Sequence, residues 1–166
     1  ELFMAARSGK LNDPKELDRQ VDRMLKDPKA QAFVRHFPSA WLRLDKLGDM
    51  PPSGGDYQFY KNLKVEPMLA KQVTTYFEEI LKANGRIEQF IDSDYTYMNQ
   101  TLAKWIYKRE GIRGQRLRKV KLDDPRRGGI FTQPGLMTAT ANGVDTSPVV
   151  RGVWVLENIL GTPPAP

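Results

Sequence analysis

The spacing of apolar positions predicts three helices in the first half of the chain. The first begins after Asp13 and ends near Pro28, and its apolar residues recur every three or four positions: Leu17, Val21, Met24 and Leu25. A second apolar stripe contains Pro38, which is expected to kink or split the helix; its members are Phe33, Val34, Phe37, Trp41, Leu44 and Leu47. The strongest pattern predicts a helix over residues 65–83, closed by Asn84-Gly85 and preceded by a glycine- and proline-rich loop at residues 48–56.

The second half is less regular. Residues 87–91 predict a short helical turn, and Thr96 is expected to cap a helix whose apolar residues are Met98, Leu102, Trp105 and Ile106. Residues 110–130 lack helical spacing and are expected to form a loop or a short strand. Ser147-Pro148 is expected to start a last helix, which is apolar on most faces and should therefore be well buried. The predicted fold is mostly α, with five to seven helices and one irregular segment.

The predicted organisation is a single helical module over residues 1–164, or two sub-segments at 1–91 and 92–164. Residues 161–166 have the composition of a stiff proline-rich linker. The chain opens in an apolar run without an initiator methionine, so we expect it to be cut from a larger protein. The absence of a signal peptide is therefore no guide to its compartment.

Composition excludes several kinds of chemistry within these residues. The 166 residues include no cysteine and one histidine, His36. Disulfides, thiolate zinc sites, cysteine catalysis, haem attachment and multi-histidine metal sites are therefore ruled out in this chain. We interpret His36 as an ordinary histidine on a helix surface or at its boundary with the core, since no nucleophile motif accompanies it.

The net charge of +6 comes from one stretch. Residues 101–127 hold ten basic and three acidic side chains, a net charge of +7, whereas the rest of the chain is nearly balanced. Such a segment can bind nucleic acid, an acidic protein or another anionic polymer. Aromatic residues suited to base stacking are nearly absent from residues 104–127, so nucleic acid is the less favoured interpretation.

Two short patterns carry possible chemistry. Arg126 and Arg127 precede Gly128 and Gly129, a combination that forms either an anion cradle of backbone amides and guanidinium groups or a tight turn needing positive φ. Asp92 and Asp94 form a carboxylate pair, which serves either a polysaccharide-acting enzyme or a helix-capping turn. The enzyme hypothesis requires both carboxylates to line a cleft with aromatic residues: Tyr95, Tyr97 or Trp105.

Three runs in the second half carry a family resemblance: Ser93 to Asn99, Arg127 to Gln133, and Thr146 to Pro164. Together they resemble the exported multidomain proteins of planctomycete-type bacteria whose segments are known as domains of unknown function 1592 and 1588. The resemblance implies a periplasmic or exported location and an association with cytochrome-c-like domains. Any haem c would belong to flanking regions, and no cofactor or metal is expected here. The chain departs from the family pattern at Ala141 and at Lys108-Arg109-Glu110.

The leading hypothesis is a non-catalytic helical module that docks a neighbouring domain, an acidic protein or an anionic glycan through its basic loop. The residues expected to contact the anion are Arg126, Arg127 and Arg151, with Gly128 and Gly129 as backbone donors. A structural latch is expected at the helix starts, formed by Asp94, Thr96, Asn99 and Ser147. Arg151 lies among apolar neighbours and should need a partner such as Asp94 or a backbone carbonyl.

Overall fold

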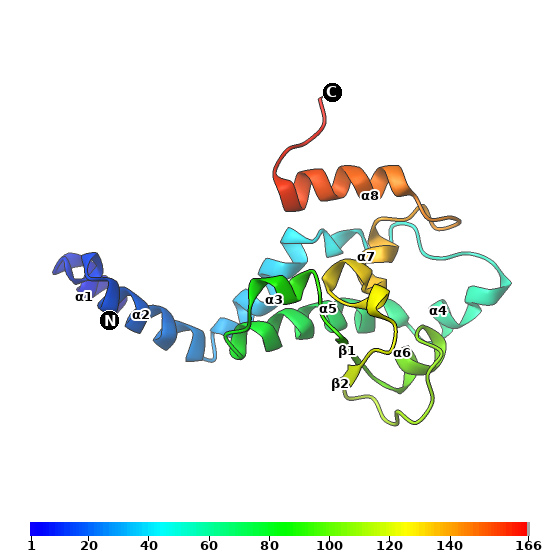
Figure 1. Ribbon diagram of the computed structural model, residues 1–166, viewed down its shortest axis with the longest axis horizontal. Coiled ribbons are helices and arrows are strands. Elements are labelled where there is room, and N and C mark those ends of the chain that lie inside the picture. The colour runs from blue at the N-terminus through cyan, green and yellow to red at the C-terminus, as the bar shows by residue number, and fades with distance from the viewer. Residues whose placement is uncertain (166) are drawn as a thin grey trace. The chain divides into compact units, whose positions relative to one another are not determined.

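The computed structural model describes residues 1–165, without the side chains of Asp56 and Pro125 (Figure 1). The chain divides into two compact units, Glu1–His36 and Phe37–Pro166. Eight α-helices, several short 3-10 turns and one two-stranded sheet lie within the described residues. The predicted mostly α fold is therefore confirmed.

Unit 1 contains helices α1 (Leu2–Arg7) and α2 (Pro14–Lys26) and the start of α3 (Ala30–Trp41). The predicted start of α2 is confirmed, because the Asp13 side chain accepts a hydrogen bond from the amide of Lys15 at 3.0 Å. The helix ends at Lys26, next to the predicted boundary.

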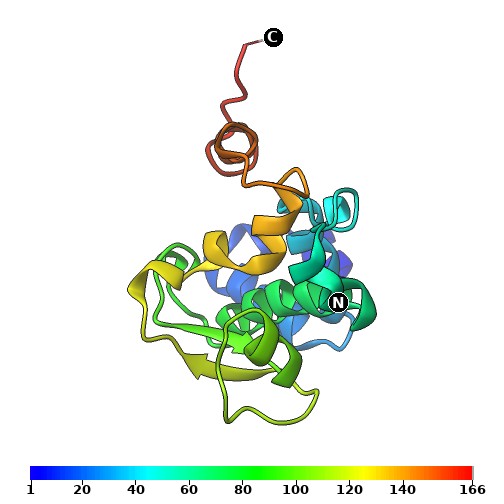
Figure 2. The ribbon, with the colours of Figure 1, turned by 90° about the vertical axis from the view of Figure 1, so that its right-hand side faces the viewer.

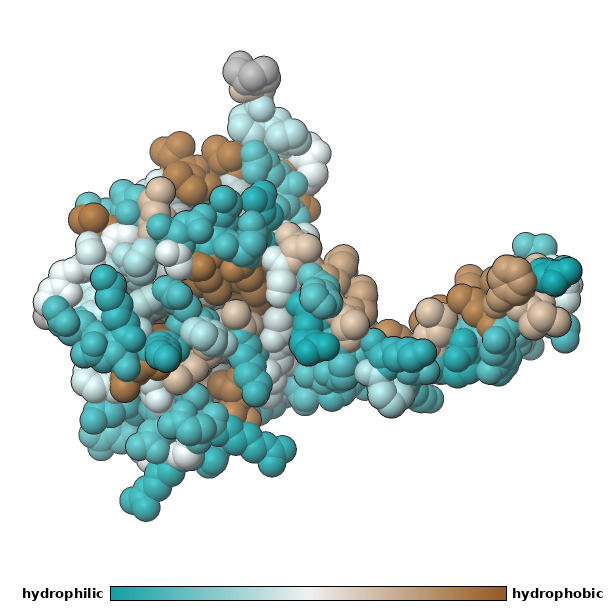
Figure 3. All heavy atoms as spheres, turned by 180° about the vertical axis from the view of Figure 1, so that it is seen from behind, coloured by the Kyte–Doolittle hydropathy of each residue, from teal (hydrophilic) through white to brown (hydrophobic). Residues whose placement is uncertain are grey.

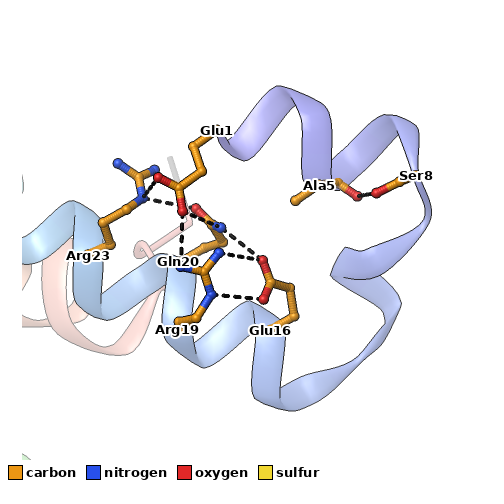
Figure 4. A network of polar contacts seen from close by, with 7 residues as sticks. All are labelled: Glu1, Ala5, Ser8, Glu16, Arg19, Gln20 and Arg23. Atoms are coloured by element: carbon orange, nitrogen blue, oxygen red, sulfur yellow. Dashed lines mark hydrogen bonds and ion pairs between the residues drawn. The ribbon is translucent and has the colours of Figure 1, made fainter.

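An exposed polar network joins the first residue to α2 (Figure 4). Arg19 contacts Glu1 at 2.9 Å and Glu16 at 2.8 Å, and this bonding lowers the pKa of Glu16 to about 2. Between them, the buried amide of Gln20 donates to Glu16 at 2.9 Å. Because the charged groups face water, these ion pairs fix geometry more than they add stability.

The apolar stripe of α2 forms a helix face but not a core. Its members are 42% to 47% exposed: Leu17, Val21, Met24 and Leu25. A hollow of about 560 Å³ runs beside this face, with Phe33 of α3 on its wall. Apolar atoms accordingly form a row along one side of unit 1 in Figure 3. Helical spacing predicted the element correctly, but nothing in unit 1 covers its apolar face.

Of the two outcomes expected at Pro38, a kink or a split, the split does not occur. Helix α3 runs through Pro38 to Trp41, and the Pro38 carbonyl still accepts from the amide of Leu42 at 3.0 Å. The helix ends because Arg43 adopts a left-handed conformation, with φ 55°. A 3-10 turn at Leu44–Lys46 then completes the predicted stripe.

Helix α5 (Val65–Lys82), preceded by the short α4 (Gln58–Asn62), is the central element of unit 2. Its predicted end is confirmed in detail. Asn84 is left-handed, with φ 47°, its amide donates to Leu81, and the amide of Gly85 donates to the carbonyl of Ile80 at 2.8 Å. This is the hydrogen-bond pattern of a Schellman cap.

Residues 95–98 overturn one prediction. Thr96 does not cap a helix; it lies in strand β1 (Tyr95–Met98), which pairs antiparallel with β2 (Arg118–Lys121). Asn99 instead caps α6 (Gln100–Trp105), its side chain accepting from the amide of Leu102 at 2.9 Å. Aromatic and β-branched residues favour an extended backbone, and all four residues of β1 are buried.

Strand β1 lies between two apolar clusters that α5 joins. Its tyrosines belong to the larger cluster with Val73 and Tyr76 of α5, whereas Met98 belongs to the smaller cluster with Leu69. Figure 2 shows the small sheet beside α5. A strand buried on both faces explains why its sequence shows no polar and apolar alternation.

The last part of the chain holds α7 (Pro134–Ala139), which the sequence analysis did not predict, and α8 (Pro148–Val155), which continues as a π-helical turn at Leu156–Leu160. The predicted start at Ser147-Pro148 is confirmed, but the expected burial is wrong. Within this helix and its extension only Trp154 is buried, and Val149 is 77% exposed. The helix is held through Trp154 and a hydrogen bond from Trp41 Nε1 to the Asn158 carbonyl at 2.8 Å.

Replacing the residue before α6 or the residue before α8 by alanine should lower the stability of the protein by different amounts. Asn99→Ala removes a buried side-chain bond and should destabilise the protein by about 1 kcal/mol. Ser147→Ala should change stability by less than about 0.5 kcal/mol, because the Ser147 side chain makes no capping bond. Urea unfolding of both variants measures the difference, and equal losses would contradict this assignment.

Candidate functional site

A basic pocket lies where β2 and the loop before it meet α5. The hollow has a volume of about 600 Å³. Its lining includes four cationic side chains: Lys71, Arg116, Arg118 and Lys119. Thr75, Glu79, Tyr97 and Leu117 complete the wall. We call these eight residues the basic pocket.

The four cations are held differently. Arg118 donates through Nη2 to the carbonyl of Arg113 at 2.8 Å, and Lys119 Nζ lies 3.7 Å from the centre of the Tyr95 ring. Lys71 and Arg116 are exposed. Among the described residues, none of the four forms an ion pair, and Glu79 is the one acidic residue in the pocket wall. The pocket is therefore strongly positive.

A buried glutamine fixes α5 against β1 beneath the pocket. The amide nitrogen of Gln72 lies 3.2 Å from Thr96 Oγ1, 2.6 Å from the Tyr97 carbonyl and 2.9 Å from the Tyr107 hydroxyl. Burial raises the pKa of Tyr107. Thr96, expected to be a helix cap, acts instead as an acceptor for this glutamine.

The irregular segment is tied to the start of α6. The amide of Gly114 donates to Gln100 Oε1 at 2.9 Å, and the amide of Gln100 donates to the Gly114 carbonyl at 3.0 Å. Asn99 Nδ2 also reaches the carbonyl of Gln115 at 3.4 Å. These bonds position Arg116 two residues before β2. Asn99 therefore both caps α6 and contacts the basic segment, whereas two other residues expected in the latch make no helix cap: Thr96 lies in β1, and the Ser147 side chain forms no capping bond.

Tyr97 lines the pocket from the buried strand. Burial raises its pKa to about 12, and the negative charge of Glu79 acts in the same direction. The register pairs Tyr97 directly with Lys119 across the sheet. At neutral pH the phenol is therefore uncharged and adds no negative charge beside the cations.

The cations selected from the sequence lie elsewhere. Arg126 is exposed and bonded to Asp124, with Nε 2.9 Å from Oδ1, and this contact raises the pKa of Arg126. Arg127 is exposed. Arg151 donates from Nε to Thr140 Oγ1 at 3.3 Å, so its expected pairing with Asp94 or a carbonyl is wrong for this nitrogen. Lys71 was missed because only folding brings α5 beside the basic segment.

Gly128 and Gly129 are packing residues. A Cβ on Gly128 would lie 1.7 Å from the carbonyl oxygen of Ser93, and one on Gly129 would lie 2.1 Å from that of Ile91. Gly129 also has a φ of 75°, and its amide donates to Ser93 Oγ at 3.0 Å. The expected anion cradle is therefore wrong for the Gly129 amide, which is already bonded.

Ser93 connects this turn to the core. Its Oγ lies 2.7 Å from the hydroxyl of Tyr76, which also contacts the Gln89 carbonyl at 2.5 Å. Tyr76 is fully buried, and burial raises its pKa well above the usual value. Ser93 stood in the motif that carried the family resemblance, but no sequence pattern pointed to Tyr76 as its partner.

Asp92 and Asp94 do not line any of the described pockets together with Tyr95, Tyr97 or Trp105. Both are exposed, and Asp94 lies 3.6 Å from Lys121 Nζ. Tyr95 and Tyr97 are buried, and Tyr97 lines the basic pocket, whose wall includes neither aspartate. Among the described side chains, no group of three or more histidine, aspartate or glutamate residues is placed to hold a metal.

Comparison with protein families identifies the chain. Residues 1–107 match the family model PSD4, Protein of unknown function (DUF1592). The chain belongs to the DUF1592 family. Residues 127–166 match a second model, PSCyt3, Protein of unknown function (DUF1588), and both names denote planctomycete cytochrome-c-associated domains. No curated protein and no solved structure matches the chain. No helix in the described part is long and apolar enough to cross a membrane.

The two family matches leave residues 108–126 uncovered. This interval contains three of the four pocket cations: Arg116, Arg118 and Lys119. Lys71 and Tyr97 lie within the DUF1592 match. The basic pocket of this DUF1592 protein is therefore formed by α5 and β1, which lie within the DUF1592 match, and by residues 116–119, which lie outside both matches.

The turn glycines give a matched test of packing. Gly128→Ala places a methyl group against backbone and should destabilise this DUF1592 protein by about 2 kcal/mol or more. Gly152→Ala lies in open space within α8 and should leave stability unchanged or raise it by up to about 1 kcal/mol. Chemical unfolding measures both variants, and a tolerated alanine at position 128 would refute the close approach.

Tyr97 predicts a loss of stability at alkaline pH. A raised folded-state pKa means that the folded protein holds the phenol proton more tightly than the unfolded chain does. The resulting contribution of Tyr97 to the free energy of unfolding is complete below about pH 10 and is lost as the pH rises toward 12. Tyr97→Phe should reduce that loss, because it removes the ionising group and keeps the ring. Unfolding free energies between pH 8 and 12 test this, with Tyr57→Phe, at an exposed tyrosine, as the control. Identical pH dependence in wild type and Tyr97→Phe would contradict it.

Proposed function

We propose that this chain is a non-catalytic module of a cytochrome-c-associated protein, and that it docks an acidic surface of a partner domain through the basic pocket. The family names support the association with cytochrome c. The observation that carries the docking is the group of four cations around one hollow, none of which has an ion-pair partner among the described residues. An adjoining haem domain with an acidic face is the partner that this chemistry favours.

Carboxylates are a good match for this pocket. Arginine offers a planar fork to an incoming carboxylate, and lysine offers a mobile point charge. Arg118 is already oriented by the Arg113 carbonyl, whereas Lys71 and Arg116 are exposed on the rim. Complementary charge mainly accelerates encounter and sets orientation, so the association should weaken as salt rises.

The surroundings favour a protein partner over nucleic acid. Binding of single strands requires aromatic faces on which bases stack. Tyr97 is 6% exposed, so its ring is not available. Trp105 is already stacked on Phe59, with ring centres 5.1 Å apart, and Lys104 lies over the same indole at 5.2 Å. The phosphate-attracting charge is present without a stacking platform.

If the basic pocket binds the partner, charge reversal at its cations should weaken binding of an acidic peptide more than charge reversal elsewhere. The probe is a decaglutamate peptide, with an oligothymidylate of equal charge as the comparison, and affinity is measured by calorimetry at low and high salt. Lys71→Glu combined with Arg116→Glu should weaken peptide binding about tenfold or more at low salt. Lys15→Glu combined with Lys26→Glu, at exposed lysines in unit 1, is the matched control and should change it much less.

Arg126→Glu combined with Arg127→Glu completes the set. If only this double variant loses affinity for the peptide, the partner binds at the turn of residues 126–129 rather than at the basic pocket. Unchanged affinity in the Lys71 and Arg116 variant, or tighter binding of the oligothymidylate than of the peptide, would overturn the proposal.

A further inference from the structure

Strand β2 has an outer edge that no strand of the described chain covers. In an antiparallel pair, directly opposed residues alternate between hydrogen-bonded and non-bonded pairs. The amide of Leu122 donates to the Asp94 carbonyl at 2.6 Å, one step beyond the paired residues of the sheet. Counting back along β2, the backbone groups of Val120 therefore face β1. Those of Lys119 and Lys121 point to the outer edge.

Two further hydrogen bonds agree with this alternation. On β1, Tyr97 lies opposite Lys119, and its carbonyl is turned away from β2, where it accepts from Gln72 Nε2 at 2.6 Å. On β2, the Lys121 carbonyl accepts from Arg109 Nη1, in the loop before the strand. On this edge, no residue of the described chain bonds the amide or carbonyl of Lys119 or the amide of Lys121. Such groups pair readily with an extended segment of another chain.

The side chains along this edge select the charge of that segment. Lys119 and Lys121 share the face of the sheet on which Tyr97 lies, and Lys119 and Tyr97 both line the basic pocket. Lys119 has no ion-pair partner among the described residues, whereas Lys121 has Asp94 at 3.6 Å. In an added antiparallel strand, the residue opposite Lys119 turns its side chain to this face and its amide and carbonyl toward β2. An acidic residue fits that position.

We propose that the partner's acidic segment binds as an extended strand, antiparallel to β2 on its outer edge, with acidic residues at alternate positions. The inference rests on the proposed docking through the basic pocket and adds the conformation of the partner. Main-chain hydrogen bonds to Lys119 and Lys121 set the register, and the pocket cations select the charge. Arg109, bonded to the Lys121 carbonyl and paired with Asp123, marks one end of the free edge, so the added strand is short.

Methylation of peptide amides separates strand addition from charge attraction. The probe is the peptide acetyl-Thr-Glu-Val-Glu-Val-Glu-Thr-amide, and its binding to the intact chain is measured by calorimetry. One analogue carries N-methyl groups on two glutamates and the other on the two valines, so both keep the sequence and the charge. The glutamate analogue should bind about tenfold more weakly than the parent, because it loses one or two hydrogen bonds to β2. The valine analogue should stay within about threefold of the parent, because its methyl groups face away from β2.

Equal affinity of the two analogues, or a loss confined to the valine analogue, would overturn the proposed strand. If the analogues bind equally while Lys71→Glu combined with Arg116→Glu still weakens binding, the docking proposal stands and the strand proposal fails. If the analogues differ as expected but that double variant binds as well as wild type, the edge of β2 binds the segment without the basic pocket, and the docking proposal fails.

Lys119→Pro and Lys119→Ala test the same edge from the protein side. Both remove the ammonium group, but only proline removes the outward amide, and proline is tolerated on an edge strand where the N–H faces solvent. Lys119→Pro should bind the parent peptide about threefold or more weakly than Lys119→Ala does, as expected for one hydrogen bond. Urea unfolding checks that both variants fold, and the peptide analogues decide if Lys119→Pro does not. Equal affinity of the two folded variants would contradict the proposal.

Discussion

The fold of unit 2 depends on placing a short strand in the interior. Strand β1 is buried on both faces, and its polar groups must find partners there because an unpaired buried group is costly. Strand β2 supplies one set of hydrogen bonds, and the fully buried side chain of Gln72 supplies another to the Tyr97 carbonyl. The same amide contacts Tyr107 after α6. One side chain of α5 therefore fixes the relative positions of the helix, the strand and the segment that leads into the basic loop.

The turn at Gly128 and Gly129 holds the residues just before β1 in place. Two peptide groups approach the Ser93 and Ile91 carbonyls more closely than any side chain would allow. Ser93 then joins the turn to Tyr76 in the core. The residues before β1 are thus held by hydrogen bonds and by backbone packing, while the cations of β2 stay on the surface. A rigid interior and a solvated charged edge are what a docking surface requires.

The sequence was informative wherever structure is determined locally. The caps at Asp13 and Asn84-Gly85 act within a few residues of their helices, and both were predicted correctly. Strand β1 was mistaken for a helix start because its residues pair with residues 20 to 26 positions further along the chain. The charge count located the basic segment, but Lys71 joins it only in three dimensions. Helix α8 was expected to be buried because its composition is apolar on most faces. Composition does not show which other elements pack against a helix, and only Trp154 of α8 is buried.

The charge on β2 has a second consequence. This strand pairs on one side with β1 in a two-stranded sheet, so among the described residues no strand covers its other edge, although the Lys121 carbonyl accepts a hydrogen bond from Arg109 Nη1. Exposed edges recruit further strands and promote aggregation, and lysine or arginine side chains along the edge oppose that pairing. Arg118, Lys119 and Lys121 are all exposed on β2. The cations proposed to attract an acidic partner would thus also keep copies of this chain from joining edge to edge.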